Sequence, residues 1–273
     1  MAKERSSSGD PARTLELLWR EPGSEGARRG PRQVLSVDAV VLAAVGVADA
    51  GGLEALTMRG LARRLGVTPM TLYTYVPGKA ELLDLMLDAV YLRMPRTDHA
   101  GQPWRDRVAA VASENRELYR RHPWVAVLGV SRPPLGPGTM AKYEHELTAF
   151  DGLGLDDVSM DAALTFVLGF VHSVARTAIE AEDTDRDSAL SDAQWWAVNA
   201  PLLDRVLDPG RYPLATRVGS AAGQAHQGVY DAEHAYAFGL RRVLDGLARL
   251  VEGPGASGST PPGASGSDPR GDA

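Results

Sequence analysis

The segment from residue 56 to residue 79 constrains the fold more than any other part of this chain of 273 residues. Its sequence is LTMRGLARRLGVTPMTLYTYVPGK, in which two short helical patterns are separated by Gly66 and Val67 and closed by Pro77 and Gly78. Neither pattern is long enough to give a helix that is stable in isolation. The two helices must therefore pack against each other across a tight turn.

Both short helices carry recognisable start and stop signals. Thr57 is a favourable N-cap for the first helix, and Gly66 can adopt the left-handed conformation that follows the last turn. Thr68 is the N-cap of the second helix, and Pro69 occupies its first position, where the missing N–H costs nothing. The second helix is expected to end near Tyr75, before the Pro-Gly pair.

The apolar residues of this segment divide its two helices into an inner and an outer side. The inner seam is expected to contain Leu61, Ala62, Leu65, Val67, Leu72 and Val76. The outer face of the second helix then carries Pro69, Met70, Thr71, Tyr73 and Tyr75. A helix that exposes hydroxyl and apolar groups suits the floor of the DNA major groove, where both can contact base edges.

Helical periodicity continues through the rest of the chain, and no alternating strand pattern competes with it. A helix is expected over residues 36 to 50, where Gly51 and Gly52 end it, and another runs from Lys79 towards Pro95. Longer helices are expected over residues 104–121, 124–129, 138–150, 159–181, 191–207 and 230–251. We therefore predict an all-α fold.

Composition divides the chain into four parts. Residues 1–33, rich in Ser, Gly, Pro and charged groups, are expected to form a flexible arm, and residues 34–95 a small domain that contains the short helices. Residues 96–252 are expected to form a larger all-helical domain. Residues 253–273 contain too few apolar groups to offset the entropy of ordering, so we expect a disordered tail.

The net charge of −6 is unevenly distributed. Basic residues gather near the N-terminal end, whereas residues 180 to 192 are strongly acidic. The basic residues are Arg28, Arg29, Arg32, Arg59, Arg63, Arg64 and Lys79. One end of the molecule can therefore face the phosphates of DNA while the other repels them.

Several classes of protein are disfavoured. The chain has no cysteine, which excludes disulfides, thiolate zinc sites and cysteine nucleophiles. No apolar run approaches the length of a membrane span, and no signal peptide is recognised, so a cytoplasmic protein is expected. Phosphate loops, dinucleotide motifs and serine elbows are absent, and His226 and His234 lack the spacing of a metal site. We expect neither enzyme activity, nor a cofactor, nor a metal.

The order LTMRxLAxxLGV, then TPMTLYxYV, then a lysine that opens the next helix resembles the helix-turn-helix of the tetracycline-repressor (TetR) family. The resemblance covers roughly residues 35 to 93, and spacing, turn glycine, leucine–tyrosine pair and lysine all agree. It implies a three-helix DNA-binding domain at the N-terminal end, joined to a larger all-helical ligand-binding and dimerisation domain.

The resemblance also implies roles for single residues. Arg59 matches a position that reads a guanine edge, although the neighbouring Gly60 weakens its helix by about 1 kcal/mol relative to alanine. The main base-contacting positions are Pro69, Met70 and Thr71, and Thr68 caps their helix. The phosphate-contacting positions are Thr57, Tyr73, Tyr75 and Lys79.

Two of these features also have simpler interpretations. Outside the pattern, Tyr73 would be a half-buried packing residue, and Arg63 and Arg64 a solvated face. Arg28, Arg29 and Arg32 suit insertion into the DNA minor groove, but a solubilising charge run explains them equally well.

The larger domain resembles the regulatory domain of the tetracycline-repressor branch through RHPW at residues 121 to 124, RPPLGP, DPGRYP and FGLRRVLDGLARL. The family implies a homodimer that joins through a four-helix bundle. Small and aromatic residues on the helix from residue 159 and on the last helix favour such a bundle, with Gly169, Gly239 and Gly246 permitting close crossing. The alternative is that these faces pack only within one subunit.

The same resemblance implies a small-molecule inducer of unknown identity. Pockets for flat apolar ligands favour aromatic linings. The candidate lining residues are Trp104, Tyr119, His122, Trp124, Phe166, Phe170, His172, Trp195 and the adjacent Trp196. We therefore predict a transcriptional repressor that an inducer releases from a palindromic operator. An activator of the same fold is the alternative, and an enzyme is a more remote one.

Overall fold

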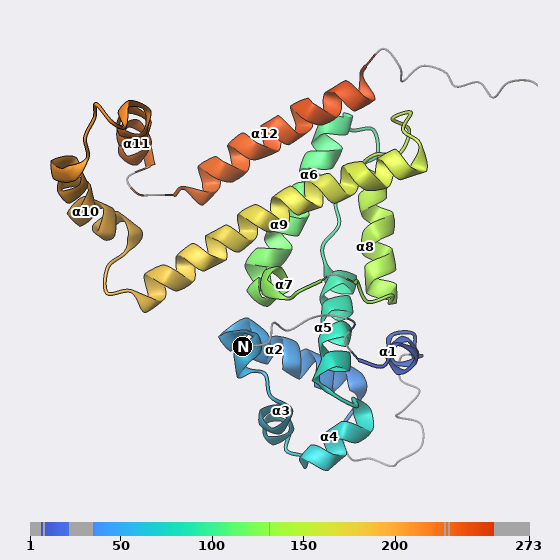
Figure 1. Cartoon of the computed structure of the whole chain (residues 1–273). Coiled ribbons are helices and arrows are strands. Elements are labelled where there is room, and N and C mark those ends of the chain that lie inside the picture. Colours follow the sequence, from blue (N-terminus) through green and yellow to red (C-terminus); the bar gives the residue numbers. More distant parts are fainter. Residues whose placement is uncertain are drawn as a thin grey trace, which may run out of the picture.

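The computed structural model describes residues 7, 9–21, 35–130, 132–226, 228 and 230–253. These residues are helical with short connections, and they contain no strand, so the predicted all-α fold is confirmed. Figure 1 shows a small N-terminal group of helices below a larger helical body, with the long helix α5 (Lys79–Arg93) running from one into the other. We call the two parts the head and the body.

The head contains α1 to α5, and the body contains α6 to α12. The helices of the head other than α5 are α1 (Pro11–Leu18), α2 (Val37–Ala55), α3 (Met58–Arg64) and α4 (Pro69–Tyr75). Those of the body are α6 (Trp104–Arg121), α7 (Pro123–Val127), α8 (Pro137–Leu147), α9 (Asp157–Asp187), α10 (Asp192–Val206), α11 (Pro213–His226) and α12 (Ala232–Val251). In Figure 1, α10 and α11 stand away from the rest of the body.

The turn between α3 and α4 has the geometry that its sequence predicts. Gly66 adopts a φ of +69°, which is the left-handed conformation that glycine favours. Its N–H donates to the carbonyl of Arg63 at 3.2 Å, and the N–H of Val67 donates to that of Ala62 at 3.0 Å. These two bonds satisfy the last carbonyls of α3 and set the direction in which α4 leaves.

The core of the head forms where α2, α3, α4 and α5 meet. Val40, Leu61, Leu72 and Leu82 are all buried there. The helical geometry of α2 breaks at Gly51 and Gly52, where φ is +71° at the second glycine, in agreement with the predicted end of this helix. Because α3 and α4 are short, this shared core is what holds them in place.

Part of the predicted flexible arm is ordered. Residues 11–18 form α1, whose N-cap Asp10 accepts a hydrogen bond from the N–H of Ala12 at 2.9 Å. Leu17 and Leu18 are buried in the core of the head, because the apolar cluster of the arm is spaced for one face of a helix. Arg28, Arg29 and Arg32, and the predicted tail beyond Gly253, lie outside the described residues.

The core of the body is formed by α6, α9, α12 and the end of α8. Val111, Phe150, Leu164, Val167 and Leu247 are buried in it. The structure extends α9 beyond the predicted end at residue 181, into its acidic stretch. It also adds α11, which sequence analysis missed because this stretch has few large apolar residues and two glycines.

Head and body meet most closely where α5 crosses the start of α8. The N-cap of α8 is Gly136, which has no side chain to offer. Asp88 on α5 replaces it, since its carboxylate accepts the N–H groups of Gly138 at 3.0 Å and Thr139 at 2.8 Å. A Cβ at Gly138 would lie 1.9 Å from the Asp88 carbonyl oxygen, so only glycine permits this approach.

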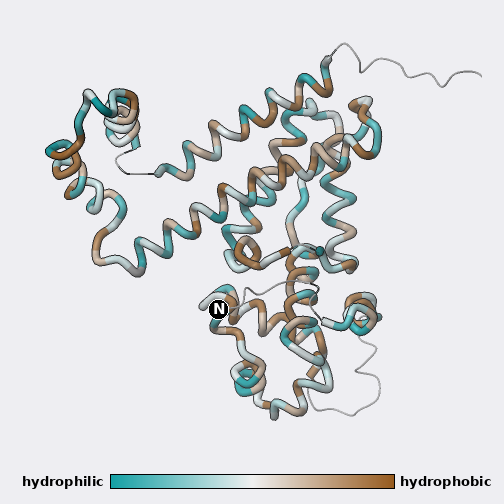
Figure 2. Tube along the Cα trace, in the orientation of Figure 1, coloured by the Kyte–Doolittle hydropathy of each residue, from teal (hydrophilic) through white to brown (hydrophobic). Residues whose placement is uncertain are grey.

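The apolar surface of α9 qualifies one sequence-based expectation. By length and hydropathy alone, residues 157–186 could cross a membrane, and only 22% of the most apolar stretch is buried. Figure 2 shows hydrophobic positions along this helix. Such a helix also suits a bundle between subunits, and the test of length and hydropathy does not distinguish the two.

Candidate DNA-binding and ligand-binding sites

Helix α4 presents a compact set of side chains to solvent. Met70 is 76% exposed and Tyr73 is 45% exposed, while Leu72 between them is fully buried. The Thr68 hydroxyl accepts a hydrogen bond from the N–H of Thr71 at 3.2 Å, and the two hydroxyls are 2.9 Å apart. The exposed face of α4 thus combines hydroxyl groups with apolar atoms, as the sequence predicts.

The first turn of α3 supports the same face. Thr57 caps α3 by accepting a hydrogen bond from the N–H of Gly60 at 3.0 Å, and Arg59 is exposed beside it. A Cβ at Gly60 would lie 2.8 Å from the Thr57 hydroxyl, which gives a local reason for the glycine that sequence analysis marked as unfavourable. Arg63 and Arg64 are also exposed, at the other end of α3.

Lys79 lies at the first position of α5, and its ammonium donates to the Leu53 carbonyl at 3.1 Å. Tyr75, at the end of α4, is partly buried and packs on the core of the head. Eight of the nine predicted DNA-contacting residues therefore lie within α3, α4 and their N-caps, and the ninth, Lys79, opens α5.

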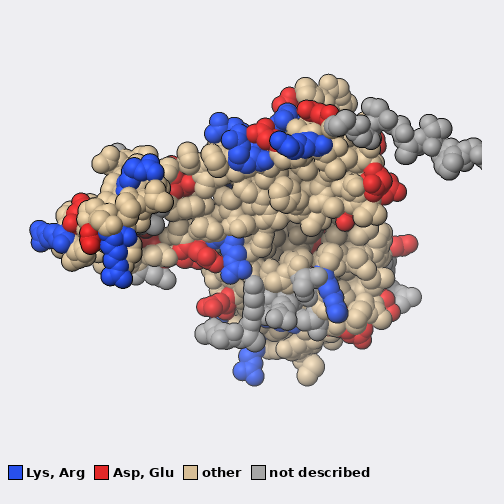
Figure 3. All heavy atoms as spheres, turned by 45° about the horizontal axis from the view of Figure 1, so that its top comes forward, with Lys and Arg blue, Asp and Glu red and all other residues tan. Residues whose placement is uncertain are grey.

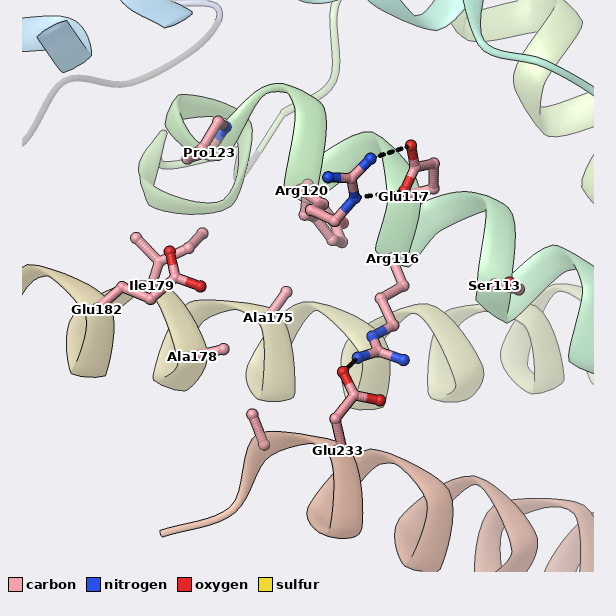
Figure 4. Close-up of a pocket in the computed structure, with 12 residues that line it drawn as sticks. Ser113, Arg116, Glu117, Arg120, Pro123, Ala175, Ala178, Ile179, Glu182 and Glu233 are labelled. Atoms are coloured by element: carbon pink, nitrogen blue, oxygen red, sulfur yellow. Dashed lines mark hydrogen bonds and ion pairs between the residues drawn. The ribbon is translucent and has the colours of Figure 1, made fainter. Parts of the chain in front are cut away.

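A cleft of about 370 Å³ opens between α6, α7, α9 and the start of α12. Figure 4 shows the charged side chains of α6 along one side and the small side chains of α9 opposite them. The lining residues are Ser113, Arg116, Glu117, Tyr119, Arg120, Pro123, Ala175, Ala178, Ile179, Glu182, Ala232 and Glu233.

Charged pairs rim this cleft. Arg116 forms an ion pair with Glu233, which joins α6 to α12. Arg120 pairs with Glu117 at 2.7 Å, and this pairing with two arginines holds the pKa of the Glu117 carboxyl down at about 2. The floor of the cleft includes Ala175, Ala178 and Ile179 and is apolar. The cleft therefore combines an apolar surface with charged groups at its rim.

The structure does not gather the predicted aromatic residues around one cavity. Tyr119 lines the cleft, and burial raises the pKa of its phenol; His172 lies edge-on to it at 5.7 Å between ring centroids. Phe170 stacks on Tyr236 at 6.1 Å, and Phe166 is 57% exposed on α9.

The remaining candidates lie apart from the cleft. Trp104 donates to Glu252 at 2.9 Å at the far end of α6. Trp195 lines a separate groove beside α10, and Trp196 packs towards α11. His122 and Trp124 both contact Asp49 of the head.

Sequence analysis missed Arg116, Glu233 and the alanines of α9 as cleft residues. The only signal was a polar stripe along α6 at residues 113, 116, 117 and 120, which follows helical spacing. A stripe of that kind usually faces solvent, and the sequence does not show that α9 and α12 lie opposite it.

A head built on a helix-turn-helix and a helical body with a cleft define a one-component DNA-binding transcriptional regulator. Residues 40–86 match the family described as bacterial regulatory proteins of the tetR family. Residues 97–251 match the tetracyclin repressor-like C-terminal domain. The chain belongs to the TetR family of DNA-binding transcriptional regulators, the family that its sequence resembles.

Curated relatives agree with this assignment. The chain is 44% identical over 252 residues to the HTH-type transcriptional repressor DrrR1 of Streptomyces coeruleorubidus, covering 91% of this chain and 89% of the relative. It is 34% identical over 170 residues to an HTH-type transcriptional regulator of Saccharopolyspora erythraea, covering 62% and 69% of the two chains.

Solved structures support the fold along most of the chain. Apo ActR from Streptomyces coelicolor superposes with a TM-score of 0.66 at 25% identity, over 81% of this chain and 99% of ActR. ActR in complex with actinorhodin gives a TM-score of 0.65 at 25% identity, over 81% and 98%. The chain is therefore similar to a regulator whose complex with a small organic molecule is known.

Proposed function

We propose that this regulator is a homodimeric repressor that a small molecule releases from a near-palindromic operator. The observation that carries the proposal is that one molecule has an exposed helix α4 in its head and a cleft in its body. Contacts between head and body connect the two sites. The 44% identity to a protein named as a repressor supports repression. In this role the protein acts in the cytoplasm and without catalysis.

DNA binding is assigned to the exposed side chains of α3 and α4. Arg59 is placed against a guanine edge, and Pro69, Met70 and Thr71 contact bases in the major groove. Phosphates are assigned to Thr57, Tyr73, Tyr75 and Lys79, and Thr68 holds the start of α4. The Lys79 ammonium donates to the Leu53 carbonyl in this structure, and its positive charge is the reason for assigning it to a phosphate.

Dimerisation is assigned to the outer faces of α9 and α12. Phe166 and Phe238 are 57% and 50% exposed, although large apolar side chains on helices are normally buried. Figure 3 shows a broad uncharged area on the body, with charged groups at its margins. Gly169 and Gly246 have open space where a Cβ would stand, so a second subunit can approach both helices closely.

Gly239 does not have the role between subunits that the sequence predicted. A Cβ there would lie 2.3 Å from the Phe170 ring, so this glycine permits α12 to pack on α9 of the same subunit. The close crossing between subunits is therefore assigned to Gly169 and Gly246 alone.

The inducer is assigned to the cleft between α6, α9 and α12. Its apolar floor and charged rim favour an amphiphilic organic molecule with a flat apolar body and ionisable or hydrogen-bonding groups. This differs from the aromatic-lined pocket for a flat apolar ligand that the sequence predicted. ActR, which is 25% identical, forms a complex with actinorhodin, and that supports a small organic ligand here.

Footprinting on the DNA that flanks the protein's own gene tests this function directly. We expect protection of two half-sites related by a dyad, lost when one compound from a panel of amphiphilic molecules is added. Single substitutions at Ala178 and Ile179 to larger residues should abolish release and leave protection intact, because both line the floor of the cleft. Protection without a dyad, or release that these substitutions leave unchanged, would count against the proposal.

A further inference from the structure

Three side chains from distant parts of the sequence meet beside the connection between head and body. His99 lies in the connection from α5 to α6, Glu114 lies on α6, and His145 lies on α8. Their potential ligand atoms all lie within 4.8 Å of one another. They share no contact with the cleft or with the DNA-binding face, so neither function requires them.

The environment of His99 is unusual for a histidine. Its side chain is buried, with 6% of the residue exposed, and neither ring nitrogen has a hydrogen-bond partner among the described residues. Its ring stacks on His145 with 4.8 Å between centroids. A buried polar group without a partner costs free energy, so a partner from outside the described residues would stabilise this imidazole.

Glu114 is already oriented towards the two imidazoles. Its Oε2 lies 2.8 Å from Nε2 of His145, and its Oε1 accepts the backbone N–H of Thr97 at 2.6 Å. A backbone hydrogen bond of this kind fixes the plane of a carboxylate, as the outer partners of metal ligands usually do. The carboxylate therefore holds one oxygen against the His145 ring, within the cluster of potential ligand atoms.

We propose that His99, Glu114 and His145 form a binding site for a divalent transition-metal ion of the Zn²⁺ type. Two imidazole nitrogens and one carboxylate oxygen are a donor set that zinc accepts, with a fourth position left for water. Ligands of a tetrahedral zinc ion stand about 3.4 Å apart, given bonds of about 2.0–2.1 Å. Small rotations of the three side chains bring atoms that lie within 4.8 Å to that spacing.

Such an ion would join three elements at a mechanically important point. The connection that carries His99 leaves the last helix of the head and enters the body, and Glu114 and His145 belong to two body helices. An ion that binds the folded chain but not the unfolded chain stabilises the folded form by mass action. Zn²⁺ would therefore raise the thermal stability and fix the path of the chain from head to body.

The test is a titration of the full-length, chelator-treated protein with Zn²⁺ alone, followed by calorimetry and by thermal unfolding. We expect one ion per chain and a rise in Tm as Zn²⁺ is added. Co²⁺ should give the visible absorption of a low-symmetry, four-coordinate ion. His99→Phe should abolish both responses while it folds at least as stably as the metal-free parent, because it removes unpartnered nitrogens and keeps a buried ring.

Glu114→Gln provides a second variant, since it keeps the shape of the side chain and removes the charge that a metal requires. Its affinity for Zn²⁺ should fall at least about 10-fold. His226 at the end of α11 and His234 near the start of α12 form the matched control, because their rings are also 4.8 Å apart but belong to other elements than the cluster. Unchanged Zn²⁺ binding in His99→Phe, or binding lost when His226 and His234 are both replaced by Asn, would overturn the proposal.

Discussion

Asp49 on α2 accepts a hydrogen bond from the indole Nε1 of Trp124 on α7, at 2.8 Å. The same carboxylate oxygen lies 2.8 Å from Nδ1 of His122. Trp124 is buried, so this contact fixes the position of the DNA-binding head against the body. Because α7 directly follows the cleft-lining end of α6, a ligand that shifts α7 would move the head through Asp49.

Trp124→Phe tests this coupling, since the substitution keeps a buried ring and removes the N–H that Asp49 accepts. We expect operator affinity without ligand to change little, and the loss of affinity caused by inducer to shrink several-fold, an effect of about 1 kcal/mol. Fluorescence anisotropy with labelled operator, with and without inducer, measures both quantities.

Trp104→Phe is the control for this experiment, because its Nε1 bonds Glu252 at the far end of the body. The coupling assigned to Asp49 would be contradicted if both variants lost inducer response equally, or if Trp124→Phe kept the full response.

Substitutions of Arg59 and Lys79 are expected to change DNA binding in different ways. Arg59→Ala should reduce the preference for operator over unrelated DNA by about 1–3 kcal/mol, the value of a bidentate contact to guanine. Lys79→Ala should lower the affinity for all DNA sequences about equally and make the affinity less dependent on salt concentration. Competition binding at several salt concentrations separates the two. If the Arg59→Ala variant still preferred the operator to the same extent, the assignment of Arg59 to a base contact would be wrong.

The DNA-binding face could be predicted from the sequence because its determinants are local. Thr57, Gly66 and Thr68 each act within a few residues, and the structure places a cap, a left-handed turn and a cap at these positions. The buried seam follows from the same short spacing. Tertiary contacts only hold the unit together and do not alter its shape.

The cleft and the histidine cluster could not be predicted, because their residues come from distant helices. Arg116 and Glu233 are 117 positions apart, and nothing in either neighbourhood specifies the other. Aromatic residues were a poor guide, since Trp104 and Trp124 form hydrogen bonds elsewhere in the fold. Asp88 shows the same limit, because it caps a helix 50 residues away.

Gly246→Leu tests the subunit interface. The position has open space in a single chain, and leucine favours a helix more than glycine does, so the subunit itself should stay folded. We expect dissociation of the dimer, measured by light scattering at micromolar concentration, with unchanged helical circular dichroism. Gly239→Leu is the matched contrast, because its side chain would strike Phe170 of the same chain and should lower Tm. A dimer of unchanged stability in Gly246→Leu would place the interface elsewhere.

Asp84 on α5 makes the stability of the head depend on pH. Burial, opposed by a hydrogen bond from the N–H of Ser7 and assisted by the charge of Glu81, raises the pKa of its carboxyl from 3.8 to about 6. Between these values the folded chain holds a proton that the unfolded chain has released, so the free energy of unfolding falls as pH rises through this window. Above about pH 6 the buried charge is a net cost, and Oδ2 has no hydrogen-bond partner among the described residues.

Asp84→Asn keeps an oxygen for Ser7 and removes the charge. It should therefore be more stable than the parent at pH 7, and the difference should be smaller at pH 4. Urea unfolding at fixed protein concentration measures the difference, and an equal gap at both pH values would show that Asp84 does not titrate in this window.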